Sequence, residues 1–203
     1  MKVRVSSVDE VKAYFASRGK FVLTFAGFSG AGYENPQRLR KIAESAFGAF
    51  PVETTIINAG ATTEGIGAVY DWAKEWGFET AGIVSTCVLE YGPLINPAVD
   101  EILYVRDDKW GGFLENGAGA RQLSPTSEAM VSVSDEMIAV GGGVITCDEL
   151  TDMVHRGKPV RFYRAQMIRN KAVAKALKNG SRLPSSFWGE ADEVFRRSED
   201  TGA

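Results

Sequence analysis

Glycines gather at three places along the chain, and each place comes directly after a short apolar run. Residues 27–32 read Gly-Phe-Ser-Gly-Ala-Gly, residues 60–67 contain three glycines, and residues 141–143 are all glycine. Glycine lets backbone N–H groups come close to a phosphate, and a helix that begins after such a turn directs its positive end there. The hydroxyls available beside these turns are those of Ser29, Thr62, Thr63 and Thr146. A single turn of this kind is explained by a tight corner, whereas three together favour a phosphate or nucleotide site.

The segments around these turns alternate between strands and helices. Apolar runs predict strands over residues 21–26, 54–57, 80–84, 101–105, 137–140 and 159–163. The alternation predicts parallel strand–helix–strand units, and hence an α/β fold with a Rossmann-like open, mainly parallel sheet and helices on both faces. The carboxyl ends of parallel strands share one edge of such a sheet, so we expect the three glycine turns to meet there.

The helices have recognisable starts or apolar faces. Ser7 is expected to cap a helix ahead of the sheet, and Asn35 with Pro36 is expected to begin the helix after the first strand. Further helices are predicted from about residue 66 to 76, 126 to 134 and 146 to 155. The glycine-rich connection over residues 106–121 is long for a compact domain, and such connections are usually functional or disordered. Its aromatic residues Trp110 and Phe113 favour a lid or a packed hairpin over disorder.

The composition bounds the class of protein. The chain has 203 residues, of which 44% are hydrophobic and 24% charged, which favours one ordinary globular domain and excludes wholesale disorder. The longest stretch without a charge, residues 21–33, is too short for a membrane span, and the first residues lack the apolar core of a signal peptide. We therefore expect a cytoplasmic protein with no membrane partner. The expected organisation is an N-terminal helical extension over 1–19, a Rossmann-like domain over 20–163, and a basic helical extension over 164–203 packed on the same domain.

The net charge of −3 conceals an uneven distribution. Residues 154–189 contain nine Lys and Arg residues and no acidic residue, whereas the chain before them is strongly acidic. Such a block either pairs with the acidic body or a second subunit, or attracts phosphates or nucleic acid. Pairing is the commoner case, because charge runs are usually solvated or paired faces.

Several known site types are absent from the sequence. Residues 30–35 read Gly-Ala-Gly-Tyr-Glu-Asn, which breaks the dinucleotide fingerprint Gly-x-Gly-x-x-Gly, and no phosphate-loop Gly-Lys-Ser/Thr is present. An acyl-transfer triad would need Ser29 with His155, the only histidine, and neither lies in a matching motif. The two cysteines form no metal motif, so we expect no resident metal, and the only cofactor left open is Mg²⁺ brought by a phosphorylated ligand.

Three segments together resemble the SLOG superfamily, which includes the LOG phosphoribohydrolases and the DprA-type DNA-processing proteins. They are residues 27–30, 58–67 and 134–150, within a resemblance that spans about residues 20–163. The LOG motif Pro-Gly-Gly-x-Gly-Thr-x-x-Glu is matched at Gly142, Gly143, Thr146 and Glu149, with Gly141 in place of proline and Ile145 in place of the third glycine. The Arg-Lys pair that serves the LOG active site falls on Thr126 and Ser127, so the arginine is lost.

The resemblance implies a nucleotide, or a nucleotide-derived phosphorylated small molecule, as the ligand. It also implies a hydrolytic role for Glu149, assisted by Glu128 or Glu64, in cleaving the N-glycosidic bond of a nucleoside 5′-monophosphate. Loss of the arginine leaves a non-catalytic nucleotide sensor as an alternative, and the basic block leaves a DprA-like nucleic-acid-binding protein as another. A homodimer is expected, since the relatives are commonly dimeric and the apolar C-terminal residues need a partner. The residues expected to bind ligand are Gly27, Phe28, Ser29, Gly30, Asn58, Gly60, Ala61, Thr62, Thr63, Glu64, Gly65, Thr126, Gly141, Gly142, Gly143 and Thr146.

Overall fold

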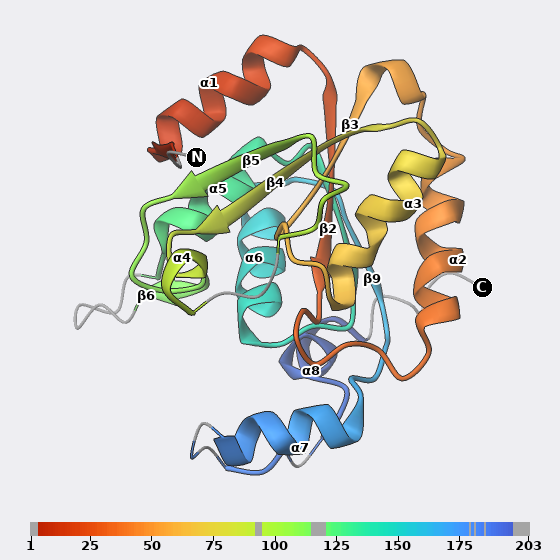
Figure 1. The fold of residues 1–203 in the computed structure, drawn as a ribbon, viewed down its shortest axis with the longest axis vertical. Helices are drawn as coiled ribbons and strands as arrows, with labels where there is room; N and C mark the ends of the chain where they lie inside the picture. Colours follow the sequence, from red (N-terminus) through yellow and green to blue (C-terminus); the bar gives the residue numbers. More distant parts are fainter. Residues whose placement is uncertain are drawn as a thin grey trace.

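A seven-stranded sheet, parallel throughout, forms the centre of the molecule (Figure 1). The computed structural model describes residues 4–91, 95–114, 121–178, 180, 182–184 and 186–196. The strand order is β1-β5-β4-β3-β2-β8-β9. These strands are β1 (Val5–Ser6), β2 (Phe21–Gly27), β3 (Thr55–Ala59), β4 (Glu79–Ser85), β5 (Glu101–Val105), β8 (Glu136–Val140) and β9 (Val160–Tyr163).

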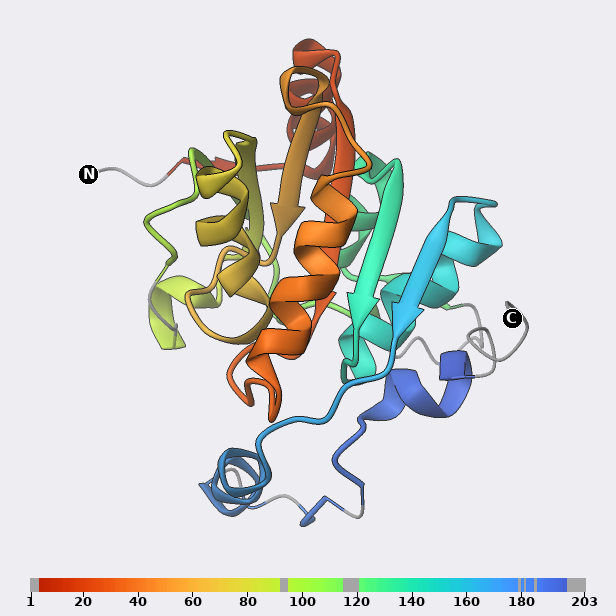
Figure 2. The ribbon, with the colours of Figure 1, turned by 90° about the vertical axis from the view of Figure 1, so that its right-hand side faces the viewer.

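Helices cover both faces of the sheet, which confirms the predicted fold class. Residues of α1, α5, α6 and α8 pack on one face, and residues of α2 and α3 pack on the other, where α2 crosses the front of the sheet in Figure 2. The helices are α1 (Val8–Arg18), α2 (Pro36–Phe47), α3 (Val69–Glu75), α4 (Val88–Tyr91), α5 (Pro125–Val133), α6 (Val144–His155), α7 (Arg169–Lys178) and α8 (Glu190–Phe195), with 3-10 turns η1 (Val52–Thr54) and η2 (Gly65–Ala68).

Strand β2, which lies between β3 and β8 in the sheet, shows why these apolar runs become strands. Val22 and Ala26 pack among the residues of the α1, α5 and α6 face, while Leu23 and Phe25 pack under α2 and α3. Side chains alternate between the two faces of a strand, and both faces here are covered. The continuous apolar run in the sequence therefore becomes a strand buried on both sides.

The predicted helix starts are confirmed at two places. Ser7 Oγ accepts the Glu10 N–H at 3.2 Å, and the Glu10 carboxylate accepts the Ser7 N–H at 2.8 Å, so the two residues form a reciprocal capping box. Asn35 Oδ1 accepts the Arg38 N–H at 2.9 Å, and Pro36 occupies the first turn of α2. These local contacts fix where the first two helices begin.

The connection over residues 106–121 contains part of a short antiparallel pair, β6 (Phe113–Leu114) with β7 (Gln122–Leu123). The hairpin interpretation is therefore confirmed for these strands, and residues 115–120 lie outside the described residues. The strand β1, which the sequence did not predict, pairs with β5 at the edge of the sheet. No helix among the described residues is long and apolar enough to cross a membrane.

The order of the strands places a switch point between β2 and β8. The chain runs outward from β2 through β3, β4 and β5, and then returns to add β8 and β9 on the other side of β2. Ligands of open α/β sheets bind outside the carboxyl ends of the strands at such a point. Residues 27–32 follow β2, residues 60–67 follow β3 and residues 141–143 follow β8; we call them the first, second and third glycine corners.

One tyrosine joins the ends of β2 and β8. The Tyr33 hydroxyl accepts the Phe28 N–H at 2.9 Å and donates to the Val140 carbonyl at 2.9 Å, and all three residues are buried. It thereby holds the first and third glycine corners at a fixed separation.

Tyr33→Phe is expected to lower the free energy of unfolding by about 2 kcal/mol, because it leaves a buried N–H and a buried C=O without partners. Tyr104→Phe is the matched control, since the Tyr104 hydroxyl has no hydrogen-bond partner among the described residues. Urea unfolding of both variants measures the difference. Equal stabilities of the two variants would show that the tyrosine bridge does not hold the corners.

Candidate functional site

A cavity of about 670 Å³ lies at the carboxyl ends of β2, β3 and β4. The first corner, the second corner and the first turns of α5 and α6 all contribute to its wall, together with one residue of the 106–121 connection and one of α7. The lining residues are Phe25, Ala26, Gly27, Ser29, Gly30, Gly60, Thr62, Ile66, Ile83, Val84, Ser85, Trp110, Thr126, Met130, Ile145, Thr146, Glu149 and Lys178. The wall thus combines an apolar floor with hydroxyls and backbone groups.

The first and second corners are in direct backbone contact. The Ile66 N–H donates to the Phe28 carbonyl at 2.7 Å. A Cβ on Gly65 would lie 2.1 Å from that same oxygen, and Gly65 has a φ of 63°. Only glycine fits such an approach, so Gly65 keeps the corners together while Gly27, Ser29, Gly30, Gly60 and Thr62 reach the cavity.

The third corner lies behind the cavity wall. Gly141 packs against the Phe28 ring, where an added Cβ would come within 2.4 Å of Cε2, and the Gly142 carbonyl accepts the Ala191 N–H at 3.2 Å. Gly141, Gly142, Gly143 and Phe28 are therefore outside the cavity lining. The glycines of this corner permit close packing, and the helix that follows them supplies Ile145 and Thr146 to the wall.

Unpaired amides face this region. In the part of the chain that the structure describes, the N–H groups of Ser29 and Gly30, and those of the first three residues of α6, 144–146, have no hydrogen-bond acceptor. The first N–H groups of any helix lack internal partners, and they carry the positive end of the helix dipole. Ser29, Gly30, Ile145 and Thr146 all line the cavity, so residues with unpaired N–H groups from two segments are part of its wall.

The start of α5 is fixed by a buried carboxylate. Asp107 accepts the Thr126 N–H through Oδ2 at 2.9 Å and the Lys109 N–H through Oδ1 at 2.9 Å. Thr126 itself is 4% exposed and lines the cavity, and its Oγ1 has no hydrogen-bond partner among the described residues. A buried hydroxyl without a partner is costly, and such groups require an explanation.

Glu149 places a buried acid in the wall of the cavity. Its side chain is in the second turn of α6, the residue is 7% exposed, and Oε1 accepts the Ser127 hydroxyl at 2.7 Å. The Ser127 Oγ in turn accepts the Gly112 N–H at 2.8 Å. Burial raises the pKa of Glu149 to about 7, against the opposing effect of the Ser127 hydrogen bond and with a smaller contribution from the Asp148 carboxylate. A carboxyl group with this pKa can both donate and accept a proton near neutral pH.

The two carboxylates expected to assist Glu149 lie outside the cavity lining. Glu128 accepts a hydrogen bond from Arg156 Nη1 at 3.1 Å and lies 3.9 Å from the Lys12 ammonium, on the side of α5 that faces α1. Glu64 is exposed and pairs with Lys171 at 3.1 Å. Glu149 is therefore the only carboxylate among the described lining residues.

Four more of the expected ligand-binding residues lie outside the cavity lining. Asn58 is buried in β3, where Nδ2 donates to Thr24 Oγ1 at 3.0 Å. Ala61 has a φ of 53°, and its carbonyl accepts the Asn96 N–H at 2.9 Å. Thr63 and Gly65 also lie outside the lining. The structure thus brings together Gly27, Ser29, Gly30, Gly60, Thr62, Thr126, Thr146 and Glu149 from the expected set.

Several lining residues carry no motif in the sequence. Ser85 is the last residue of β4 and lies at the same edge of the sheet as the glycine corners. Its place at the end of an apolar run is the one feature of the sequence that indicates a position in the cavity wall. Trp110 lies in the long connection that the sequence indicated as functional, and it is 43% exposed. Lys178 lies far along the chain in the basic block, and nothing in its spacing indicates the cavity.

The pairing interpretation holds for part of the basic block: among the described residues, three of its basic side chains pair with the acidic body and a fourth pairs with Asp192 of α8. Arg156 pairs with Glu128, and Lys171 pairs with Glu64. Arg161 pairs with Glu136, and Arg164 binds the Asp192 carboxylate through Nε at 2.7 Å and Nη2 at 3.1 Å. Within the described ranges, no group of three or more His, Cys, Asp or Glu side chains could hold a metal ion.

Comparisons with known proteins give a likeness of fold. No protein-family model matches the chain, and no curated protein sequence matches it significantly. A structure of the molybdenum cofactor carrier protein of Chlamydomonas reinhardtii is 22% identical, with a TM-score of 0.49 over 70% of this chain and 76% of that chain. A second structure of the carrier protein from that organism is 18% identical and covers 89% of this chain and 99% of that one, also with a TM-score of 0.49. The X-ray structure of TM1055, a structural-genomics target, is 16% identical and covers 69% and 72% of the two chains, with a TM-score of 0.49. Likenesses of this degree concern the general fold alone.

The buried Glu149 predicts a pH dependence of stability. Its pKa is about 7 in the folded protein and 4.5 in its ordinary state, so between these values the folded protein holds a proton that the unfolded chain releases. The stabilisation is complete below the lower value and is lost as the pH rises through the upper one. From about pH 5 to about pH 8, the wild type should lose about 3 kcal/mol of unfolding free energy relative to Glu149→Gln.

Urea unfolding of both proteins across this pH range measures the difference. Glutamine keeps an oxygen that accepts the Ser127 hydroxyl, so the variant removes the titration and retains the hydrogen bond. Curves that run parallel at every pH would contradict a buried, titrating Glu149.

Proposed function

We propose that the cavity binds a phosphorylated small molecule of the nucleoside monophosphate class. The observation that carries this proposal is that one cavity combines unpaired backbone donors from two segments with the unpartnered Thr126 hydroxyl. Backbone N–H groups beside a helix N-terminus form a suitable site for phosphate oxygens. The volume of about 670 Å³ is within the range of small-molecule sites.

The rest of the wall suits the uncharged part of such a ligand. Ile66, Ile83, Val84 and Met130 provide apolar surface, and Trp110 provides an aromatic ring on which a base can stack. The motif resemblance adds support, because Thr146 and Glu149 of the last motif line the same cavity as Gly27 and Ser29 of the first. Membership of the SLOG superfamily is part of this proposal.

Thr126→Val tests the role of the unpartnered hydroxyl, with opposite effects on stability and binding. Valine has nearly the same shape and lacks the unsatisfied group, so the free energy of unfolding should stay equal or rise by up to about 1 kcal/mol. The affinity for AMP should fall about tenfold, because a hydrogen bond to the ligand is lost. Calorimetric titration with AMP, with and without Mg²⁺, measures the affinity.

Thr55→Val is the matched control. Thr55 Oγ1 is also buried without a partner, but the residue begins β3 at the opposite edge of the sheet. This variant should have a similar stability and an unchanged affinity for AMP. Equal affinity for AMP in the wild type and Thr126→Val would contradict the proposed contact.

Hydrolysis of the N-glycosidic bond is a second candidate function, favoured by the buried Glu149. In this reaction the bond from the base nitrogen to C1′ breaks with its electron pair on the nitrogen, and the oxygen of a water molecule bonds to C1′. Glu149 in its carboxylate form takes a proton from that water and returns it to solvent, and the departing base takes a proton from solvent. A carboxylate beside the positive charge that develops at C1′ also stabilises the transition state.

Incubation with AMP, GMP, CMP and UMP, followed by chromatographic detection of free base, tests the hydrolysis. If the wild type releases base, Glu149→Gln should reduce the rate at least about a hundredfold. Absence of base at high enzyme concentration, together with tight AMP binding, would contradict hydrolysis and favour a nucleotide sensor.

Two further expectations remain proposals. Self-association as a homodimer would cover exposed apolar residues of the C-terminal segment, such as Leu177, Leu183 and Val194, and light scattering measures the mass of the assembly.

A DprA-like nucleic-acid role has less support, because much of the basic block is paired within the chain.

A further inference from the structure

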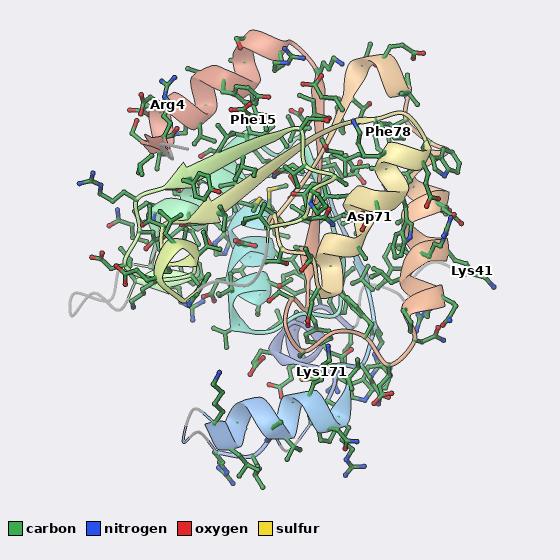
Figure 3. The ribbon with its side chains drawn as sticks, in the orientation of Figure 1. Arg4, Phe15, Lys41, Asp71, Phe78 and Lys171 are labelled. Carbon is green, nitrogen blue, oxygen red and sulfur yellow. The ribbon has the colours of Figure 1, made fainter. Side chains whose placement is uncertain are left out.

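Helix α7 extends beyond the carboxyl ends of the strands, apart from the two helical layers (Figures 1 and 2). Its first turn is fastened to the first two glycine corners. The Ile168 N–H just before it donates to the Ala31 carbonyl at 3.2 Å, and the Lys171 ammonium lies 3.1 Å from the Glu64 carboxylate. In Figure 3, Lys171 lies between α7 and the rest of the protein. The start of this helix is therefore held to the segments that form the cavity.

The other end of α7 reaches the cavity itself. Lys178, its last residue, is part of the cavity lining. It is the only basic residue among the described residues that line the cavity. Within the described part of the chain, the Lys178 side chain has no hydrogen-bond or ion-pair partner. An ammonium group without a partner is thus present at a cavity that contains backbone N–H donors.

The charges in the cavity show why this lysine matters. Glu149 is the only other ionisable lining residue, and when it is ionised it repels an anionic ligand. The remaining lining residues are glycines or carry uncharged side chains: hydroxyl, aromatic, aliphatic or, at Met130, thioether. Transfer of a phosphate group from water into such surroundings requires a compensating charge. Backbone dipoles supply part of that charge, and an ammonium group supplies more.

We propose that Lys178 binds the anionic group of the ligand in this cavity, and that α7 is consequently a part of the binding site. The inference rests on the proposed function and adds how the charge of the phosphate monoester is neutralised: by a residue of the C-terminal segment of the chain. Thr126 occupies the position that matches the LOG active-site arginine, so that position supplies no positive charge. Lys178 supplies the positive charge instead.

A structural role for the lysine makes a different prediction. Lysines in the last turn of a helix also complement its dipole. If Lys178 did only that, its removal would lower the stability of α7 and affect charged and uncharged ligands alike. A binding role instead affects only ligands that carry the phosphate.

The experiment compares AMP with adenosine by calorimetric titration at low salt. Lys178→Ala should weaken AMP binding about tenfold, as expected for loss of one charge-assisted contact that is partly exposed to water. Adenosine binding and the melting temperature should be unchanged. Lys178→Arg should restore most of the AMP affinity, and added salt should reduce the difference between wild type and Lys178→Ala.

Lys41→Ala is the matched control for the loss of one positive charge. Lys41 lies on α2 and points away from the molecule in Figure 3, and this variant should bind AMP as the wild type does. Wild-type AMP affinity in Lys178→Ala, or an equal loss for AMP and adenosine, would overturn the inference and leave the proposed function intact. A wild type that binds no phosphorylated probe would overturn both.

Discussion

The hydrogen bonds that hold the ends of β2, β3 and β8 close together are the constraint on which the site depends. The Tyr33 hydroxyl joins β2 to β8, and the Ile66 N–H joins the second corner to the Phe28 carbonyl of the first. A side chain at Gly65 would prevent this approach. Because these strands surround the switch point of the sheet, the same contacts that close the fold also define the cavity.

The main α/β layers provide the cavity with no positively charged side chain among the described lining residues. Those layers contribute one buried carboxyl group, several hydroxyls and unpaired backbone donors, but no cation among the described lining residues. The one cation comes from α7, which begins at contacts with Ala31 and Glu64. In this proposal the C-terminal segment is part of the binding site, while three other residues of the basic block, Arg156, Arg161 and Lys171, pair with carboxylates of the acidic body.

The architecture could be predicted from sequence because its signals are local. The predicted strand over residues 101–105 matches β5, and the Asn35 cap with Pro36 begins α2 as expected. The site could be predicted only in part. Glycines that let a ligand approach and glycines that let a neighbouring chain segment pack closely look alike in sequence. Sequence alone therefore does not distinguish ligand binding by Gly141 from its close packing against the Phe28 ring. The place of Lys178 depends on how α7 docks, which no local pattern encodes.

The most direct test of the central claim is a crystal structure of the full chain soaked with AMP. We expect a phosphate group within hydrogen-bond distance of the Ser29 and Gly30 N–H groups and the first turn of α6, with the base against the apolar wall. A fully occupied AMP molecule elsewhere on the surface, with no ligand in the cavity, would contradict it.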